Sequence, residues 1–375
     1  MKITGAVLES SGASRPYAQS RPLQICELDL ADPGPSEVLI RIEAAGICHS
    51  DLSVVNGDRP RPLPMLLGHE AAGIVEGIGT EISDLKVGDR VVTVFLPRCE
   101  ECANCRTDGK LPCSTGTATN GTGSLLSGTR AIRRNGDEIL HHLGVSGFAT
   151  HAVLDRNSVV PVGLDVPPAV AAVLGCAVLT GGGAVLNAGK PQEGQDIIIV
   201  GLGGVGMAAL LTARAIVSTW KTPGRIIGVD ANPDKLSLAR ELGATHAYTP
   251  KEIEDLEIRA QVVIEAAGHA RAFETAVRIT AAGGTTVTVG LPAPGALSSI
   301  EPLGLTAEAR TIVGSYLGSA VPSRDIPLYE QLWREGKLPV EKLTSSVITL
   351  DKINEAMDSL AEGKAVRQII SFEQP

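Results

Sequence analysis

Aromatic residues and long apolar runs are both scarce in this chain of 375 residues. Phe, Trp and Tyr make up 3% of the sequence, so few side chains are available to stack on the bases of a single-stranded nucleic acid. No segment approaches the roughly 18 consecutive apolar residues that span a bilayer, and the opening MKITGAVLESSG has no apolar core of a secretory signal. We therefore expect a cytoplasmic protein without a membrane partner.

Basic charge is in short supply as well. The chain has 33 Lys and Arg residues against 42 Asp and Glu residues, which gives a formal net charge of −9 at pH 7. Nucleic acids and anionic membrane surfaces bind clusters of Lys and Arg. The charge balance therefore predicts no nucleic-acid partner, and the length allows two domains that each bury a hydrophobic core.

Cysteine is infrequent too, but four of the seven cysteines stand within RCEECANCRTDGKLPC at residues 98–113. Their spacing, C-x2-C-x2-C-x7-C, suits a closed tetrahedral zinc site. An iron–sulfur cluster, disulfides or free thiols are the alternatives, and Pro112 precedes the last cysteine instead of following it as in common iron–sulfur runs. We predict a structural zinc lobe at about residues 97–115 with the ligands Cys99, Cys102, Cys105 and Cys113.

The sequence changes character near residue 178. Before this point, short β-branched runs predict a β-rich domain, and the Gly-, Ser- and Thr-rich residues 114–128 predict a surface loop. After it, apolar strands alternate with helices, which predicts parallel βαβ units and a doubly wound sheet. The expected strands are 37–47, 71–79 and 89–95 in the first part and 196–200, 225–230, 261–268, 284–290 and 310–315 in the second, with helices at 204–217, 233–242, 270–280, 325–336 and 351–361 and a last strand in AVRQIISF.

The stretch IIIVGLGGVGMAALL predicts a dinucleotide site, because its glycines follow a strand and open a helix. Gly201 allows the tight turn, Gly203 lets a pyrophosphate approach the backbone, and Gly206 lets the helix pack on the strand. Together with Gly204, these residues would hold the phosphates at the N-terminus of the helix.

Two charged residues follow at the end of the next predicted strand. Asp230 is expected to accept hydrogen bonds from both ribose hydroxyls, and its charge would repel a 2′-phosphate, so we expect NAD instead of NADP. Its alternative role is that of a helix N-cap. Lys235 could reach the ribose or remain solvated.

Five motifs occur in an order and at intervals that resemble the zinc-dependent alcohol dehydrogenases of the medium-chain dehydrogenase/reductase superfamily. They are GICHSD, GHEAAGIVEGIG, the four-cysteine lobe, GCAVLTG and GLGGVG. The resemblance covers essentially the whole chain and is greatest to the long form related to the class I and class III enzymes. It implies an α/β protein with a GroES-like catalytic domain at 1–177 and 317–375, a Rossmann NAD-binding domain at 178–316, and a homodimer.

The same resemblance implies roles for individual residues. Cys48, His69 and Cys176 would bind a catalytic zinc and leave one position open for substrate. Asp51 would orient His69, Glu70 would lie behind the zinc, and Ser50 would take the substrate proton. The implied cofactor contacts are His49, Thr180, Val205 and Arg367, and the implied substrate-pocket residues are Phe95, His142, Leu143 and Tyr316.

Two departures from the family pattern affect the expected function. Ser53 stands where many relatives carry a histidine that passes the proton to solvent, so the relay would end differently. Thr117 stands at the apparent match of an arginine that holds a glutathione adduct in class III enzymes. We expect an NAD-linked enzyme that interconverts a primary or secondary alcohol with its aldehyde or ketone, and aryl and allylic alcohols are the candidate substrates. A thiol-adduct or polyol dehydrogenase and a catalytically silent zinc- and NAD-binding protein are the alternatives.

Overall fold

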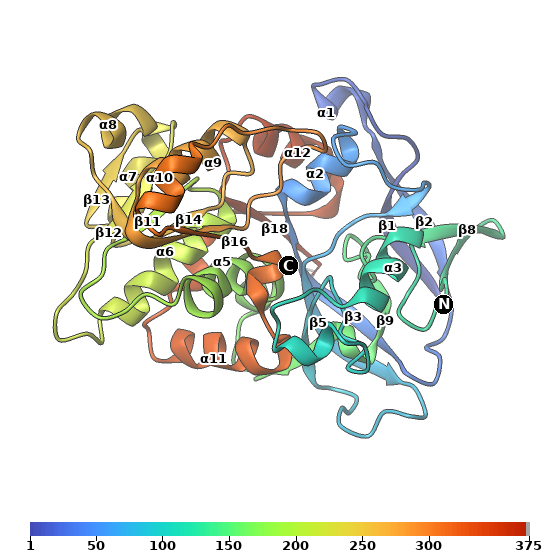
Figure 1. Ribbon diagram of the computed structural model, residues 1–375. Helices are drawn as coiled ribbons and strands as arrows, with labels where there is room; N and C mark the ends of the chain where they lie inside the picture. The colour runs from blue at the N-terminus through green and yellow to red at the C-terminus, as the bar shows by residue number, and fades with distance from the viewer. Residues whose placement is uncertain (373–375) are drawn as a thin grey trace. The chain divides into compact units, whose positions relative to one another are not determined.

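The computed structural model describes residues 1–372, and the chain divides into two compact units (Figure 1). Unit 1 comprises Met1–Cys176 and the segment that begins at Thr344, and unit 2 comprises Ala177–Leu343. The second junction lies after residue 343, whereas the sequence placed it after residue 316. The reason is that helix α11 (Pro322–Arg334) packs on helix α5 (Leu179–Gly183), so residues 317–343 belong with unit 2.

Unit 1 is built from a small closed barrel and a seven-stranded sheet. The barrel joins β1 (Lys2–Leu8), β2 (Leu23–Leu30), β7 (Ile132–Arg134), β8 (Asp137–His141) and β4 (Met65–Leu66). The sheet has the order β10 (Val159–Val162), β6 (Arg90–Thr93), β5 (Ala71–Ile78), β3 (Glu37–Ile47), β18 (Arg367–Ser371) and β17 (Thr344–Ile348), and β9 (His151–Asp155) also pairs with β3. Leu28, Leu66, Ile132 and Val153 belong to one buried apolar cluster of this unit.

Unit 2 is a six-stranded parallel sheet with helices between its strands. Its order is β13 (His246–Tyr248), β12 (Ile226–Val229), β11 (Ile197–Val200), β14 (Ala260–Glu265), β15 (Thr280–Thr288) and β16 (Thr311–Gly314). The chain runs from β11 outward to β13 and then returns to β14 on the other side of β11. This reversal is the point at which doubly wound sheets bind ligands, at the carboxyl ends of the strands.

The helices of unit 1 are short, and those of unit 2 cover its sheet. In unit 1 they are α1 (Tyr17–Ser20), α2 (His49–Val55), α3 (Ser114–Thr122), α4 (Pro168–Val173) and α12 (Ile353–Ala361). In unit 2 they are α5, α6 (Gly204–Val217), α7 (Pro233–Glu241), α8 (Pro250–Asp255), α9 (Ala270–Arg278), α10 (Pro302–Ala307) and α11.

One helical stretch, Pro168–Gly189, is long and apolar enough to cross a membrane. However, 83% of its apolar window is buried inside the protein, as in the core helix of a globular fold. It includes two π-helical turns, η3 (Leu174–Val178) and η4 (Ala184–Gly189).

The predicted loop at residues 114–128 is wrong in its first half, because Ser114–Thr122 forms helix α3. The sulfur of Cys113 caps this helix by accepting from the backbone N–H of Gly116 at 3.3 Å. Threonine hydroxyls then bond to carbonyls of the preceding turn, as Thr117 Oγ1 does to Cys113 O at 2.7 Å. The Thr- and Gly-rich composition has a low intrinsic helix propensity. In this helix, threonine side chains hydrogen-bond to the helix's own backbone.

Candidate active site

Cys48, His69, Glu70 and Cys176 come together in the interior of unit 1. Each offers one ligand atom, and these atoms all lie within 4.8 Å of one another. His69 Nε2 is 3.5 Å from the sulfur of Cys176, and all four side chains are buried. The two thiols and the imidazole at this spacing fit three of the four positions of a tetrahedral divalent metal such as zinc.

Three separate segments deliver these side chains. Cys48 lies between β3 and α2 and is the N-cap of that helix. His69 and Glu70 immediately precede β5, and the hydroxyl of Thr93 on β6 fixes the start of that strand. It accepts from the N–H of Ala71 at 2.9 Å and donates to the carbonyl of Ala71 at 3.1 Å. The sequence analysis missed Thr93, whose position in a plain apolar strand carries no functional signal.

Cys176 lies in the π-helical turn η3, which follows α4. A π turn adds a residue to the helical repeat and is frequent at functional sites. Here it carries a buried thiol of the cluster within a helix that is otherwise apolar.

Asp51 ties two members of this cluster together. Its Oδ2 accepts from the backbone N–H of Cys48 at 3.0 Å, and its Oδ1 accepts from Nδ1 of His69 at 2.8 Å. The side chain of Asp51 is fully buried. Burial acts to raise the pKa of Asp51, but His69 and His142 lower it below the usual value. The carboxylate therefore stays ionised and directs Nε2 of His69 toward the thiols.

The pKa values of the two thiols and the imidazole are shifted in different directions. Contact with the Cys176 thiol lowers the pKa of Cys48, and contact with Cys48 raises the pKa of Cys176. Burial acts to lower the pKa of His69, but Asp51 and Cys48 raise it. A divalent cation bound among these groups would deprotonate both thiols.

Glu70 and Arg367 lie beside the thiols. Arg367 Nε is 3.4 Å from Glu70 Oε1, and Arg367 Nη1 donates to the carbonyl of Ile47 at 3.1 Å. Burial raises the pKa of Glu70 to about 7, although Arg367 opposes this rise. The structure thus places Arg367 against the cluster of unit 1, and its role in binding a dinucleotide stays a prediction.

The four cysteines of the lobe also converge. The sulfurs of Cys99, Cys102, Cys105 and Cys113 lie within 4.8 Å of one another. Ser114 and backbone N–H groups lower the pKa of Cys102 to about 5, whereas burial and neighbouring sulfurs raise the pKa of Cys105 to about 12. The donor set fits zinc.

The glycine-rich loop of unit 2 has the predicted conformation. Gly201 has a φ of +90°, and a Cβ atom on Gly206 would stand 1.8 Å from the carbonyl oxygen of Gly201. Gly203 precedes α6 as its N-cap, and a Cβ atom there would meet nothing within 4 Å. The first and third glycines are therefore required by the backbone, and the space at the second is open to a ligand. Gly204 and Val205 form the first turn of α6.

Asp230 follows β12 and is held by two backbone groups. Its Oδ2 accepts from the N–H of Leu202 at 2.8 Å, and its Oδ1 accepts from the N–H of Asn232 at 2.9 Å. Lys235 Nζ is 4.0 Å from Asp230 Oδ2. The N-cap of α7 is Asn232, which excludes the alternative that Asp230 has this role. The carboxylate therefore lies beside the glycine loop, where the ribose contact was predicted.

Helix α2 carries the residues of the expected proton relay. His49 is exposed and Ser50 half-buried in its first turn. The hydroxyl of Ser53 donates to the carbonyl of His49 at 2.9 Å and is buried. Its proton is committed to the helix backbone, so Ser53 does not replace the base that many relatives carry.

The predicted pocket residues fall in both units. The ring of Phe95 meets the ring of His69 edge-on, with centroids 5.5 Å apart. His142 and Leu143 follow β8 and are buried, and the ring of His142 is also 5.5 Å from that of His69. Thr180 on α5 and Tyr316, which is 38% exposed at the start of η5 (Tyr316–Ser319), belong to unit 2.

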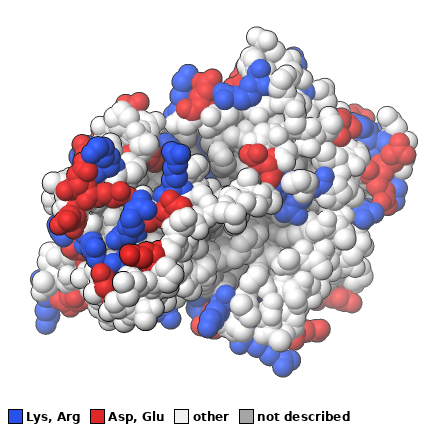
Figure 2. All heavy atoms as spheres, turned by 45° about the horizontal axis from the view of Figure 1, so that its top comes forward, with Lys and Arg blue, Asp and Glu red and all other residues white. Residues whose placement is uncertain are grey.

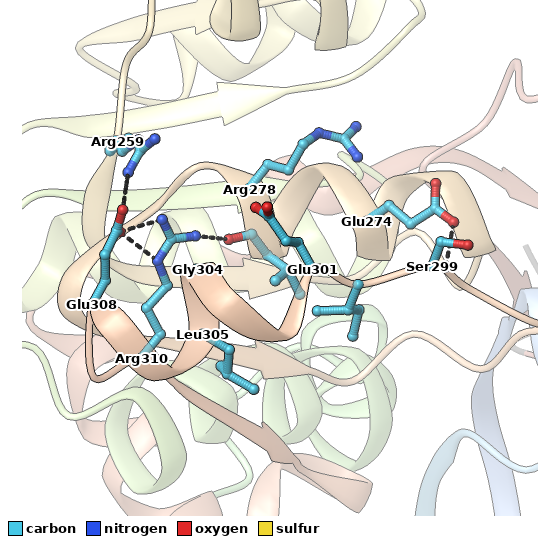
Figure 3. Close-up of a pocket in the computed structure, with 11 residues that line it drawn as sticks. Arg259, Glu274, Arg278, Ser299, Glu301, Gly304, Leu305, Glu308 and Arg310 are labelled. Atoms are coloured by element: carbon cyan, nitrogen blue, oxygen red, sulfur yellow. Dashed lines mark hydrogen bonds and ion pairs between the residues drawn. The ribbon is translucent and has the colours of Figure 1, made fainter.

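A pocket of about 520 Å³ in unit 2 contains none of the predicted site residues (Figure 3). Its arginines face internal partners, since Arg259 and Arg310 pair with Glu308, and Arg278 pairs with Glu254. On the face shown in Figure 2, basic and acidic side chains are interspersed. Neither feature points to a polyanionic ligand.

Comparison with known proteins agrees with the geometry. Residues 34–164 match the alcohol dehydrogenase GroES-like domain, and residues 204–334 match the zinc-binding dehydrogenase family. The S-(hydroxymethyl)glutathione dehydrogenase of Escherichia coli O1:K1 is 33% identical over 373 residues, which cover 96% of this chain and 100% of the relative.

Two solved structures resemble the chain over the full length of both proteins. Benzyl alcohol dehydrogenase from Acinetobacter calcoaceticus is 31% identical with a TM-score of 0.89. An alcohol dehydrogenase zinc-binding domain protein from Burkholderia ambifaria is 32% identical with a TM-score of 0.90. The predicted GroES-like and Rossmann folds are confirmed. The chain belongs to the zinc-binding alcohol dehydrogenases, and it is a zinc-containing, NAD-linked oxidoreductase of that family.

Proposed function

We propose that the enzyme interconverts primary or secondary alcohols, with a preference for aryl or allylic ones, with their aldehydes or ketones, at a zinc held by Cys48, His69 and Cys176. The observation that carries this assignment is the convergence of these three ligand atoms within 4.8 Å, beside a buried carboxylate that orients the histidine. When bound, zinc supplies a Lewis acid for the alcohol or carbonyl oxygen, and NAD supplies the hydride acceptor.

The protein's own residues then have defined tasks. Asp51 keeps Nδ1 of His69 protonated, so that Nε2 presents its lone pair to the metal. Ser50, two residues after Cys48, receives the proton of the substrate hydroxyl. Because the hydroxyl of Ser53 donates to the helix backbone, the proton continues through water or through the exposed His49.

In unit 2, Gly201, Gly203, Gly204 and Gly206 bind the pyrophosphate of NAD at the N-terminus of α6. The ribose hydroxyls donate to Asp230, whose negative charge disfavours NADP. Thr180 and Val205 line the nicotinamide site, and Lys235 contacts the ribose. These assignments rest on the loop geometry and on the family pattern.

The lobe of Cys99, Cys102, Cys105 and Cys113 holds a second zinc with a structural role. Four sulfurs would fill all positions of a tetrahedral ion, so no position would be open to substrate. This differs from the first cluster, in which two thiols and one imidazole leave room for a ligand.

The preference for an aryl or allylic substrate is supported by the pocket residues. The aromatic ring of Phe95 contacts the ring of His69. Leu143, which follows His142 in the sequence, is buried as well. A relative at 31% identity is a benzyl alcohol dehydrogenase.

A thiol adduct is the second candidate, because an S-(hydroxymethyl)glutathione dehydrogenase is 33% identical along the chain. Thr117 argues against it. By the family pattern a cation would hold the adduct's carboxylate at this position, whereas the hydroxyl of Thr117 donates to the carbonyl of Cys113 at 2.7 Å. A neutral side chain engaged in this way offers little attraction to a carboxylate.

We further propose a cytoplasmic homodimer. In unit 2, Leu297 and Leu303 are 88% and 71% exposed, and they lie close in sequence to β16, the edge strand of the sheet. Exposed apolar side chains and the edge strand of a sheet both favour association of two copies. Light scattering on the wild type and on a Leu303→Glu variant tests this, with a monomeric wild type as the contrary result.

The substrate assignment is tested by following NAD reduction with benzyl alcohol, cinnamyl alcohol, ethanol, sorbitol, and formaldehyde with glutathione. We expect turnover of the first two without added thiol, and its loss in Cys48→Ser. Turnover only with formaldehyde and glutathione would establish the thiol adduct, and preference for sorbitol would establish a polyol dehydrogenase. No turnover in a protein that binds zinc and NAD would indicate a silent binder.

A further inference from the structure

Asp51 faces two imidazoles instead of one. Its Oδ1 accepts from Nδ1 of His69 at 2.8 Å, and Nδ1 of His142 lies 3.3 Å from the same oxygen. All three side chains are buried, with exposed fractions of 1% or less. Two ring nitrogens therefore approach the same carboxylate oxygen.

The fold brings the second imidazole to this place. Strand β4 pairs in parallel with β8, so that Leu66 is opposite His141, and both strands then lead directly into the site. His69 follows β4 and His142 follows β8, with their rings edge-to-face at an interplanar angle of 88°.

The position of His142 is fixed by its own backbone. Its N–H donates to the hydroxyl of Ser146 at 3.0 Å, and its carbonyl accepts from the N–H of Val145 at 3.0 Å. The ring nitrogen Nδ1 is buried and has no aligned hydrogen-bond partner other than the approach to Asp51. A buried ring nitrogen without a better partner is drawn to the nearest carboxylate.

The sharing matters because outer partners tune a metal-bound histidine. A carboxylate that accepts from the free N–H of such a histidine makes the imidazole more basic and strengthens its bond to the metal. A second donor on the same oxygen draws part of that electron density away. The imidazole of His69 then becomes a weaker donor, and the metal a stronger Lewis acid.

We propose that His142 is a positioning residue that shares Asp51 Oδ1 with His69 and thereby weakens the hold of His69 on the catalytic zinc. The inference rests on the proposed zinc site. In this role His142 does more than line the substrate pocket. Its replacement would have the opposite effect on zinc binding from the replacement of a residue that only packs. A histidine that only filled space would loosen the site when replaced, whereas a competing donor tightens it.

The test measures how fast a chelator removes zinc. The catalytic zinc is the kinetic phase that is missing in Cys48→Ser. We expect His142→Phe to slow this phase by about three- to tenfold, within the range typical of outer partners. His142→Asn keeps an N–H near the position of Nδ1 and should behave like the wild type. Asp51→Asn removes the negative charge that His69 donates to and should release zinc faster.

A cobalt-substituted enzyme gives a second readout. Its visible absorption reports the ligand field directly, so His142→Phe should shift the bands and His142→Asn should restore them. If His142→Phe does not fold, which thermal melting shows, His142→Leu provides the same loss of the donor. Release that is unchanged or faster in these variants overturns the inference. A wild type that lacks the Cys48-dependent zinc phase overturns the proposed function itself.

Discussion

Arg367 and Glu70 form an ion pair in the interior of unit 1. Arg367 Nε lies 3.4 Å from Glu70 Oε1, and the two side chains are 3% and 0% exposed. Neither atom has a well-aligned hydrogen bond, so the pair rests mainly on charge. Burial raises the pKa of Glu70 to about 7, and the guanidinium opposes this rise.

Removal of Arg367 should therefore destabilise the protein through its partner. Arg367→Met leaves a buried carboxyl without its cation, and we expect the free energy of unfolding to fall by about 3 kcal/mol. Glu70→Gln in the same chain should recover part of this loss, because no charge then remains. Urea unfolding of the two single variants and the double variant measures the coupling, and strictly additive effects would contradict it.

The buried side chain of His141 is expected to make the free energy of unfolding depend on pH. Burial lowers the pKa of this residue to about 4, and its Nε2 accepts from the N–H of Ala131 at 3.0 Å. Between pH 6.5 and 4 the unfolded chain binds the extra proton, so stability falls as the pH falls. From pH 7 to pH 5 this group should cost about 2 kcal/mol of unfolding free energy.

The matched variant is His141→Gln, whose side-chain oxygen can accept from Ala131. Its free energy of unfolding should change less between pH 7 and pH 5 than that of the wild type. The same pH slope in both proteins would show that His141 is not neutral in the folded state.

The four-cysteine lobe is expected to bind a zinc ion that can be lost without loss of the catalytic zinc. Cys105→Ser removes one of four sulfur ligands, so the zinc content should fall from about two ions per chain to about one, and the melting temperature should fall by several degrees. Cys26→Ser is the control, because Cys26 lies on β2 outside both metal clusters. Unchanged zinc content in Cys105→Ser would refute the structural site.

Asp230 is expected to determine the preference for NAD over NADP. Asp230→Ser removes the negative charge beside the glycine loop, so the ratio of kcat/KM for NADP to that for NAD should rise by about tenfold or more. Lys235→Ala is the matched control, since it removes a cation 4.0 Å from the same carboxylate and should not improve the use of NADP. Steady-state kinetics with both cofactors decides between these outcomes.

Local pattern accounts for the elements that the sequence predicted well. The run at 37–47 forms β3 (Glu37–Ile47), and the run at 204–217 forms α6 (Gly204–Val217), because apolar periodicity and the glycines are local signals. Helix α3 was missed because its Thr- and Gly-rich composition resembles a loop. Hydrogen bonds between its threonines and its own backbone are not visible in composition.

The outer partners of the site could not be predicted in the same way. The metal ligands follow motif spacing, but the approach of His142 to Asp51 depends on the pairing of β4 with β8. The contact of Arg367 with Glu70 likewise depends on β18 pairing with β3. Such contacts join residues far apart in the chain, and a single sequence holds no local signal for them.

The placement of β18 has a consequence for biosynthesis. This strand lies between β3 and β17, and its first residue, Arg367, donates to Ile47 across 320 positions of the chain. The ribosome therefore completes the whole of unit 2 before the last wall of the cysteine and histidine cluster exists. Arg367 can therefore meet Glu70 only after the whole of unit 2 has been synthesised.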